Sequence, residues 1–240
     1  MPEFLTFALY APIASFGAPA VGERRATFER PARSALLGLI GACLGLDRAD
    51  DGAQQALADG YGLAVRAEAP GLLLADYHTA QVPPTKRDRR FATRAEELKA
   101  GDLSTVLSRR DYRTDAWHLA AAWTNPDARW TLAAIADAMR EPVFTPSLGR
   151  KACPLGLPLA PIVLEATDPV AALAIRRDNG PERLMRAGLR VPNNNAIVAM
   201  DENEWSQDMP RLRTERRRDA PLSRKRWQFA LRNEIVVAAL

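Results

Sequence analysis

Tyr77 and His78 are the adjacent residues in this sequence whose side chains are best suited to acid–base chemistry. Metal-independent cleavage of RNA needs a base for the ribose 2′-hydroxyl, an acid for the leaving 5′-oxygen and a cation for the phosphorane. His78, Tyr77 and Lys86 are of the types that fill those roles. His118, the other of the two histidines, lies in an apolar stretch, where we expect a hydrogen-bonded core side chain.

Basic residues are concentrated in three segments. Residues 24–33 hold four, residues 86–113 hold nine and residues 211–232 hold nine, so 22 of the 33 lysines and arginines lie there. Such clusters indicate a polyanionic partner, although solvated basic loops are the alternative interpretation. Beside a basic segment, Tyr77 and His78 become a candidate pair for stacking on bases, while packing at the end of a strand is the simpler explanation.

The segment Ser147–Lys151 is suited to holding a phosphate. It offers backbone N–H groups and two cations, and Gly149 leaves room for a close approach. An ordinary turn glycine is the simpler explanation from the residues alone.

Three arginines surround Tyr112 near the end of the second basic segment: Arg109, Arg110 and Arg113. They either clamp phosphates or pair with Asp111 and Asp115. Surface ion pairs contribute little to stability, so the sequence leaves both possibilities open.

Hydrophobic patterns and turn residues predict the elements that must position these side chains. We expect strands at 4–10, 62–68, 72–78, 106–112, 116–123, 162–166, 197–200, 227–231 and 234–239, the last two joined by a tight turn at Asn233. We expect helices at 32–45, from Asp50 or Asp51 to Gly60, from Asn125 to before Pro142, and at 169–177. Long loops are expected at 11–30 and 211–226, and a projecting, mobile insertion at 79–104. Gly38, Gly41 and Gly45 predict close packing of the first helix on a sheet.

Composition narrows the class of protein. The 240 residues carry 33 basic and 29 acidic side chains, for a net charge of +4. Two cysteines, Cys43 and Cys153, do not make a disulfide framework, and we interpret both as structural thiols. The longest apolar stretch, 34–46, is too short to cross a bilayer, and the first residues do not resemble a signal peptide. We therefore expect a cytoplasmic protein without membrane contact, metal or cofactor, with Trp117, Trp123 and Trp130 in its core.

The order of elements over the first two thirds is strand, helix, strand, insertion, strand, helix, strand. This order is typical of an α+β, ferredoxin-like (RRM-like) unit with a long arm in its middle. We expect this unit at 1–165, including the arm at 79–113, and a small β-rich extension at 166–240.

Two motifs carry a resemblance to a known family. They are Pro31-x-Arg33-Ser34-x-Leu36-Leu37-Gly38-Leu39-x-Gly41-Ala42-Cys43-Leu44-Gly45 and Thr145-Pro146-x-Leu148-Gly149-Arg150-x-x-Cys153-Pro154. Weaker support comes from Arg110-x-Tyr112-x-x-Asp115-Ala116. Over roughly residues 3–165 the chain resembles the CasD family of the type I-E CRISPR surveillance complex, Cascade, within the RAMP superfamily. The insertion at 81–107 and the basic segment 211–226 depart from the family pattern.

The resemblance implies a non-catalytic, single-copy subunit that holds the 5′ handle of the CRISPR RNA for interference against foreign DNA. The arm, or thumb, would fold over the RNA. The implied partners are the RNA, the backbone subunit CasC, the large subunit CasA, and target DNA reached through the complex. The implied RNA-binding residues are Arg24, Arg25, Arg33, Tyr77, His78, Lys86, Arg87, Arg89, Arg90, Arg109, Arg110, Arg113, Ser147, Leu148, Gly149, Arg150 and Lys151. Two alternatives are an endoribonuclease that processes repeat RNA, as some RAMP relatives do, and a protein-only scaffold.

Overall fold

The structure, a computed structural model, is built around one long and mostly antiparallel sheet. The structure describes residues 1–240 apart from 19, 21, 86, 189–195, 205–208 and 240. The sheet runs in the order β10-β11-β9-β5-β7-β1-β8, and neighbours along this path are antiparallel. Its strands are β1 (Glu3–Ala14), β5 (Tyr61–Ala69), β7 (Ser104–Thr124), β8 (Ile162–Glu165), β9 (Ile197–Asp201), β10 (Arg211–Ser223) and β11 (Gln228–Ala238). The fold is mixed α/β and mostly sheet.

Helices cover both faces of this sheet, which explains the nearly continuous apolar run of β1. One face packs against α1 (Arg33–Cys43), α2 (Asp51–Asp59) and α4 (Leu132–Arg140). The other face packs against α5 (Pro169–Asn179). A short helix that we did not predict, α6 (Arg183–Gly188), follows α5. No helix in the described part of the chain has the length and apolar character needed to span a membrane.

Local capping explains where most helices begin. Asp50 accepts a hydrogen bond from the Ala53 N–H, and Asp168 accepts from the N–H groups of Val170 and Ala171, as expected at these helix starts. The helix expected from Asn125 begins later, at Leu132. Thr131 is its N-cap, because the Thr131 side chain accepts from the Ala134 N–H while residues 125–130 form turns.

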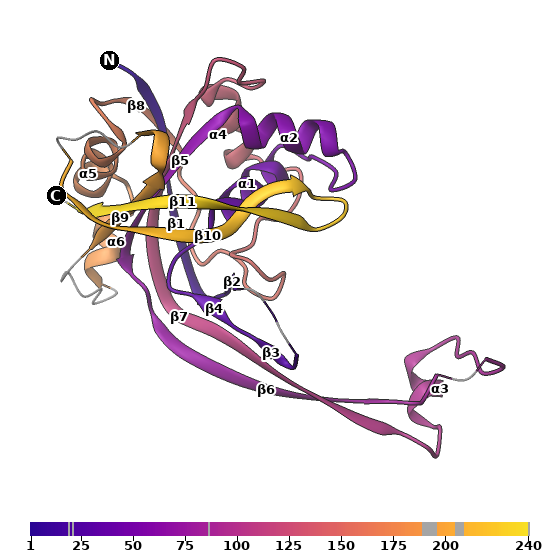
Figure 1. The fold of residues 1–240 in the computed structure, drawn as a ribbon. Helices are drawn as coiled ribbons and strands as arrows, with labels where there is room; N and C mark the ends of the chain where they lie inside the picture. Colours follow the sequence, from indigo (N-terminus) through magenta and orange to yellow (C-terminus); the bar gives the residue numbers. More distant parts are fainter. Residues whose placement is uncertain (19, 21, 86, 189–195, 205–208, 240) are drawn as a thin grey trace.

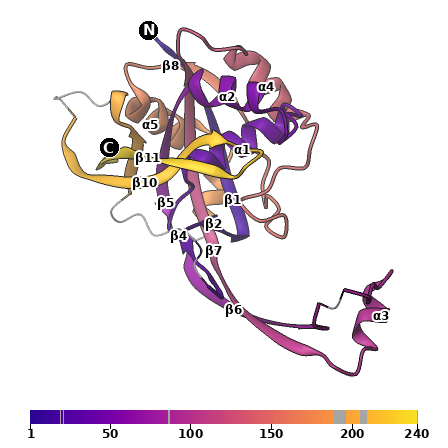
Figure 2. The same ribbon diagram turned by 45° about the vertical axis from the view of Figure 1, so that its right-hand side comes forward.

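The two strands expected at 106–112 and 116–123 are one continuous strand, β7. Asp115 joins them in a left-handed backbone conformation, with φ 55°. On the N-terminal side of Asp115, residues 104–114 of β7 lie outside the body and pair with β6 (Leu72–Val82). The two strands form a ribbon that projects away from the sheet (Figures 1 and 2). The ribbon therefore starts at Leu72, earlier than the insertion expected at 79–104, and carries α3 (Arg94–Leu98) near its tip.

The loop expected at 11–30 contains short strands. β1 continues to Ala14, and β2 (Phe16–Gly17) pairs with β4 (Thr27–Phe28). Between the latter two, β3 (Arg24–Arg25) pairs in parallel with β7.

The prediction of a basic loop at 211–226 is wrong, because residues 211–223 form strand β10. Asn233 is not a turn: it lies within β11 opposite Arg216, and the turn between the two strands is at 224–227. The pattern misled us because inward residues of β10, such as Arg217, are buried charges paired with acids such as Glu234, and so give no apolar alternation. η1 (Glu202–Glu204) connects toward this hairpin, and β9 joins β11 to β5.

The glycines of α1 permit close packing, both against the turn of the β10–β11 hairpin, which belongs to the sheet, and against α2. A Cβ on Gly38 would lie 2.8 Å from Nη2 of Arg224, in the β10–β11 turn. A Cβ on Gly41 would meet Leu57 of α2 at 3.5 Å. The glycine run therefore fits α1 against the C-terminal hairpin and a second helix.

Two of the three tryptophans expected in the core are buried, and the third packs against it. Trp117 and Trp123 lie in the core, Trp130 is half-buried, and burial raises the pKa of the Cys43 thiol to about 11. His118 is fully buried as expected, but neither ring nitrogen has a hydrogen-bond partner among the described residues. Burial, with the nearby charges of Arg30 and Arg113, lowers the pKa of His118 to about 3, so its imidazole is neutral.

Candidate nucleic-acid interface

The base of the ribbon brings together arginines that are far apart in the sequence. In the parallel pairing of β3 with β7, Arg24 lies opposite Arg109 and Arg25 opposite Arg110. The pairing is fixed by a hydrogen bond from the Arg109 N–H to the carbonyl of Glu23, at 3.1 Å. Two of the three basic segments of the sequence therefore meet at one place.

Asp111 is the buried acid around which these arginines are arranged. Arg24 donates from Nε and Nη2 to Oδ2 of Asp111 at 2.9 and 2.7 Å, and Arg109 donates from Nε to Oδ1 at 3.2 Å. Burial alone would raise the pKa of Asp111, but the hydrogen bonds and charges of Arg24 and Arg109 lower it overall. The carboxylate is ionised at neutral pH and holds two guanidinium groups in fixed positions.

Both guanidinium groups remain accessible on their outer sides. The Asp111 side chain is 1% exposed, whereas that of Arg24 is 57% exposed and that of Arg109 is 49% exposed. A guanidinium group has five N–H donors, so a side chain anchored on one edge keeps donors for an incoming anion. We name Arg24, Arg109 and Asp111 the arginine hub.

The segment Ser147–Lys151 joins the hub from a third part of the chain. Arg150 donates from Nη1 to the carbonyl of Asp111 at 3.2 Å and from Nη2 to that of Arg25 at 3.0 Å. Its guanidinium carbon lies 4.5 Å from the centre of the Tyr112 ring. Arg150 therefore fastens this turn to the base of the ribbon, while Lys151 is exposed beside it.

A glycine is needed at position 149 for a structural reason that the sequence did not reveal. Its φ is +94°, and a Cβ on it would overlap the carbonyl oxygen of Ser15. The close approach that needs a glycine is thus made by the protein's own backbone. Leu148 is also structural, because its side chain is buried in the core and its carbonyl accepts from the Ser15 N–H at 3.0 Å. Ser147 is half-buried, and its backbone forms an isolated antiparallel β-bridge with Pro154.

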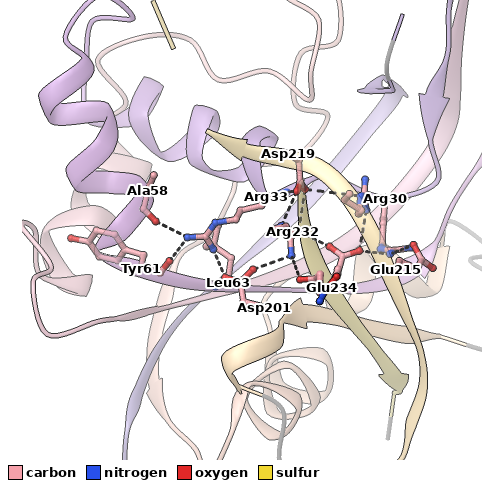
Figure 3. A network of polar contacts seen from close by, with 12 residues as sticks. Arg30, Arg33, Ala58, Tyr61, Leu63, Asp201, Glu215, Asp219, Arg232 and Glu234 are labelled. Atoms are coloured by element: carbon pink, nitrogen blue, oxygen red, sulfur yellow. Dashed lines mark hydrogen bonds and ion pairs between the residues drawn. The ribbon is translucent and has the colours of Figure 1, made fainter. Parts of the chain in front are cut away.

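Arg33 lies apart from the hub, inside a network of buried charges (Figure 3). Its guanidinium pairs with Asp201 and donates to the carbonyls of Ala58 and Tyr61 at 2.6 and 2.8 Å. Its side chain is 11% exposed, and its backbone N–H donates to Asp219 at 2.8 Å. These contacts explain Arg33 as the anchor of α1, so its expected place among the RNA contacts is not supported by its position.

Tyr77 and His78 project from opposite faces of the ribbon, because they are adjacent in β6. Tyr77 is 63% exposed and lies opposite Arg109, whereas His78 lies opposite Ser108. Nε2 of His78 is 2.5 Å from Oδ2 of Asp76, which shares its face. The expected stacking pair is therefore not formed, and the two side chains cannot act together on one phosphate.

The remaining candidates divide between the base and the tip of the ribbon. At the base, Arg110 is exposed, but Arg113 is mostly buried and donates to the Gly71 carbonyl at 3.4 Å. Near the tip, Arg89 pairs with Asp102 at 2.7 Å, Arg87 and Arg90 are exposed, and Lys86 lies outside the described residues. Arg110 and Ser104 are six positions apart in β7, which is about 20 Å of strand. The tip arginines therefore form a second basic region, away from the hub.

Asp111 is the central residue that we did not single out as an organiser. A signal was present: in a strand, Asp111 shares a face with Arg109 and Arg113, two residues away on either side. No arrangement of three or more metal-ligating side chains occurs among the residues that the structure describes.

Fold and site together define a mixed α/β protein whose cationic surface surrounds the base of a projecting β-ribbon. The family model described as CRISPR-associated protein (Cas_Cas5) matches residues 4–233. The chain belongs to this family of CRISPR-associated proteins.

Individual relatives agree with the family. The Cascade subunit CasD of Escherichia coli (strain K12) is 36% identical over 175 residues, which cover 72% of this chain and 76% of that protein. A chain of a CRISPR RNA-guided surveillance complex superposes with a TM-score of 0.60 at 24% identity, covering 99% of this chain and 90% of that one. A crystal structure of a Cas protein gives 0.59 at 20% identity, covering 98% and 94%. At these identities the two structures show a shared fold.

Proposed function

We propose that this chain is a non-catalytic, RNA-binding subunit of a type I-E CRISPR surveillance complex, in which it holds the 5′ handle of the CRISPR RNA. The observation that carries the proposal is the arginine hub, where Asp111 fixes Arg24 and Arg109 with their outer edges accessible. Identity to a Cascade subunit supports the assignment to this kind of complex.

The sheet order supports a ferredoxin-like unit at 1–165. Strands β8, β1, β7 and β5 are adjacent and antiparallel, with α1 and α2 between β1 and β5, and α4 between β7 and β8. This is the order expected of two βαβ halves that share one sheet. On this proposal, the ribbon of β6 and β7 is the thumb, and residues 166–240 are the β-rich extension.

The chemistry of the hub suits an RNA backbone. Guanidinium groups bind phosphates through two parallel hydrogen bonds, and the exposed ring of Tyr77 beside Arg109 offers a surface for one splayed base. The proposed RNA contacts are Arg24, Arg25, Tyr77, Arg109, Arg110, Arg150 and Lys151. We assign the tip arginines Arg87, Arg89 and Arg90 to the junction of the RNA with the backbone subunit CasC. CasA is the proposed large-subunit partner, and target DNA is reached through the complex.

The endoribonuclease alternative finds no geometric support. Its proposed base and acid, His78 and Tyr77, lie on opposite faces of the ribbon, and His118 is a neutral, fully buried side chain. A protein-only scaffold would not need half-exposed guanidinium groups held by a buried acid.

The test compares two double variants of the full chain, each assembled with its sister subunits. Arg24→Ala/Arg109→Ala removes two hub cations, and the matched control Arg129→Ala/Arg140→Ala removes two exposed cations elsewhere. The hub variant should bind a labelled 5′-handle RNA at least about tenfold more weakly, because each lost charged contact is large. Its salt slope should fall by about 1.4, for two phosphates on a single strand. Equal affinities for the hub variant and the control would remove the hub from the RNA site.

A further inference from the structure

The β10–β11 hairpin has two faces of different character. Its inner face carries Arg232 and Glu234, which belong to the buried charge network against α1 (Figure 3). Arg217 lies on the same face and donates to Glu234. On its outer face, Arg216 lies opposite Asn233 and Arg218 lies opposite Leu231. All four outer residues are exposed. The alternation of the strands thus leaves a basic and partly apolar surface outside, which the arginine hub does not use.

An exposed tryptophan lies at the end of this surface. Trp227 is 58% exposed and packs edge-to-face on Phe229, with 5.5 Å between ring centres. The guanidinium carbons of Arg48 and Arg224 lie 4.7 and 5.1 Å from the centre of the Trp227 ring. More than half of the residue nevertheless stays open to solvent, and exposing so large an apolar side chain costs hydrophobic free energy in a free protein.

The turn that presents Trp227 is held firmly. Asp51, at the start of α2, accepts from the Ser223 hydroxyl at 3.0 Å and from the Lys225 N–H at 3.2 Å. Trp227 has φ 59°, a left-handed conformation that is uncommon for a large side chain and persists only where surrounding contacts fix it. Arg224 is seated against α1 at Gly38, where a Cβ would crowd it. The ring and its two cations are therefore pre-positioned.

The charges at the turn favour an anion. Arg48 and Arg224 approach the same ring, and Arg48 donates from Nε to the Arg224 carbonyl at 3.0 Å. Burial and the charge of Arg48 lower the pKa of Arg224. Three carboxylates lie nearby, and none of them forms an ion pair with Arg48 or Arg224 in the described part of the chain: Asp51 accepts hydrogen bonds from the turn, Asp50 caps α2, and Asp47 accepts from the Ala49 N–H.

We infer that the outer face of this hairpin binds single-stranded nucleic acid, with a base stacked on Trp227 and phosphates on Arg224, Arg48, Arg216 and Arg218. An aromatic ring set among arginines is the arrangement that binds single strands without sequence preference. An acidic protein surface would use the cations but would have no need of an exposed indole. The turn lies beside α1 and α2, whereas the ribbon leaves the body at another place, so the surface is separate from the hub (Figures 1 and 2).

The test uses the full chain and a labelled twelve-nucleotide oligothymidylate, which has no handle sequence. Trp227→Ala should weaken binding about tenfold, and Trp227→Phe should retain most of the affinity. Arg216→Ala/Arg218→Ala should reduce the slope of affinity against salt concentration by about 1.4, whereas the control Arg129→Ala/Arg140→Ala should leave this slope unchanged. Oligothymidylate should also quench tryptophan emission in the wild type, and this quenching should be largely lost in Trp227→Phe.

Each result decides for or against the surface. Unchanged binding in both Trp227→Ala and the Arg216/Arg218 variant overturns the inference, as does full quenching in Trp227→Phe. Loss of binding in the hub variant alone would assign the oligonucleotide to the ribbon base and leave the proposed function intact. If oligoglutamate competes equally well and Trp227→Ala has no effect, the partner is an acidic protein. If Trp227→Ala does not fold, the phenylalanine and double-arginine variants still decide.

Discussion

The Arg24 guanidinium donates two hydrogen bonds to one carboxylate oxygen of Asp111, a residue 87 positions later in the chain. This contact fastens β3 to β7, the strand that forms the ribbon. It also fixes a half-exposed cation at the point where the ribbon leaves the body.

Asp111→Asn should weaken binding of the handle RNA about fivefold, although it makes the protein more positive by one charge. The amide keeps the shape but loses the charge-assisted bonds that orient Arg24 and Arg109, each worth about 1–3 kcal/mol. Binding is measured by fluorescence anisotropy at fixed salt. Tighter binding would mean that Asp111 only neutralises the arginines.

Asp111 should also contribute to stability in a pH-dependent way. Its pKa is lowered in the folded state, so its contribution is present above the unfolded pKa of about 3.9 and is lost as the pH falls through the lower folded value. Denaturation of wild type and Asp111→Asn between pH 7 and pH 2.5 should show the difference shrinking in acid. A constant difference would contradict a buried carboxylate held by arginines.

Gly149→Ala should destabilise the protein by about 1–3 kcal/mol, because alanine is strained at a φ of +94° and its Cβ would overlap the Ser15 carbonyl oxygen. Gly101→Ala is the matched control, since a Cβ there meets nothing within 4 Å. That variant should stay within about 0.5 kcal/mol of wild type. Urea denaturation measures both, and similar effects at the two positions would show that Gly149 is an ordinary turn residue.

His118 should make the protein sensitive to moderate acid. Its folded pKa is about 3, and its unfolded pKa is about 6.5, so below pH 6.5 only the unfolded chain takes up the proton. Stability should fall by about 1.4 kcal/mol per pH unit down to pH 3, or about 2.7 kcal/mol at pH 4.5. His118→Phe should remove this slope, and His78→Gln should keep it. The same slope in all three proteins would place the titration elsewhere.

Replacing residues 79–107 by Asn-Gly should leave a folded body without stable assembly into the complex. His78 and Ser108 are paired in register, so a two-residue turn can close the shortened ribbon. The removed strand residues are largely exposed and contribute little to the core. Calorimetry should show an unchanged thermal transition. A shorter replacement of residues 83–103, between paired Val82 and Ser104, separates the contribution of the tip, and unfolding of either variant would show that the ribbon supports the core.

Much of the local structure followed from residue types. Of the two candidates at the start of the second helix, Asp50 is the cap, and Asp168 caps the helix expected at 169–177, because a carboxylate that accepts from nearby N–H groups acts within a few residues. The apolar run after Glu3 predicted a buried strand correctly, because the hydrophobic pattern that indicates burial lies in the strand's own side chains. The motifs around Gly38 and Gly149 also predicted the family, which the match over residues 4–233 confirms.

The site itself depended on contacts between distant segments. Nothing near Ala32 shows that α1 is capped by Asp219, or that Arg33 is buried against Asp201, because those partners come from the C-terminal strands. Strand β10 was predicted as a loop because its buried arginines pair with acids on other strands. Gly149 was assigned to RNA binding because its close neighbour, the Ser15 carbonyl, is distant in the sequence. Residue types established that the chain is basic, the order of the main strands and helices from β1 to β8, and the family to which the chain belongs. Which arginines stay accessible was decided by folding, since a guanidinium group is available to a ligand only when the acids and carbonyls that hold it leave one of its edges exposed to solvent.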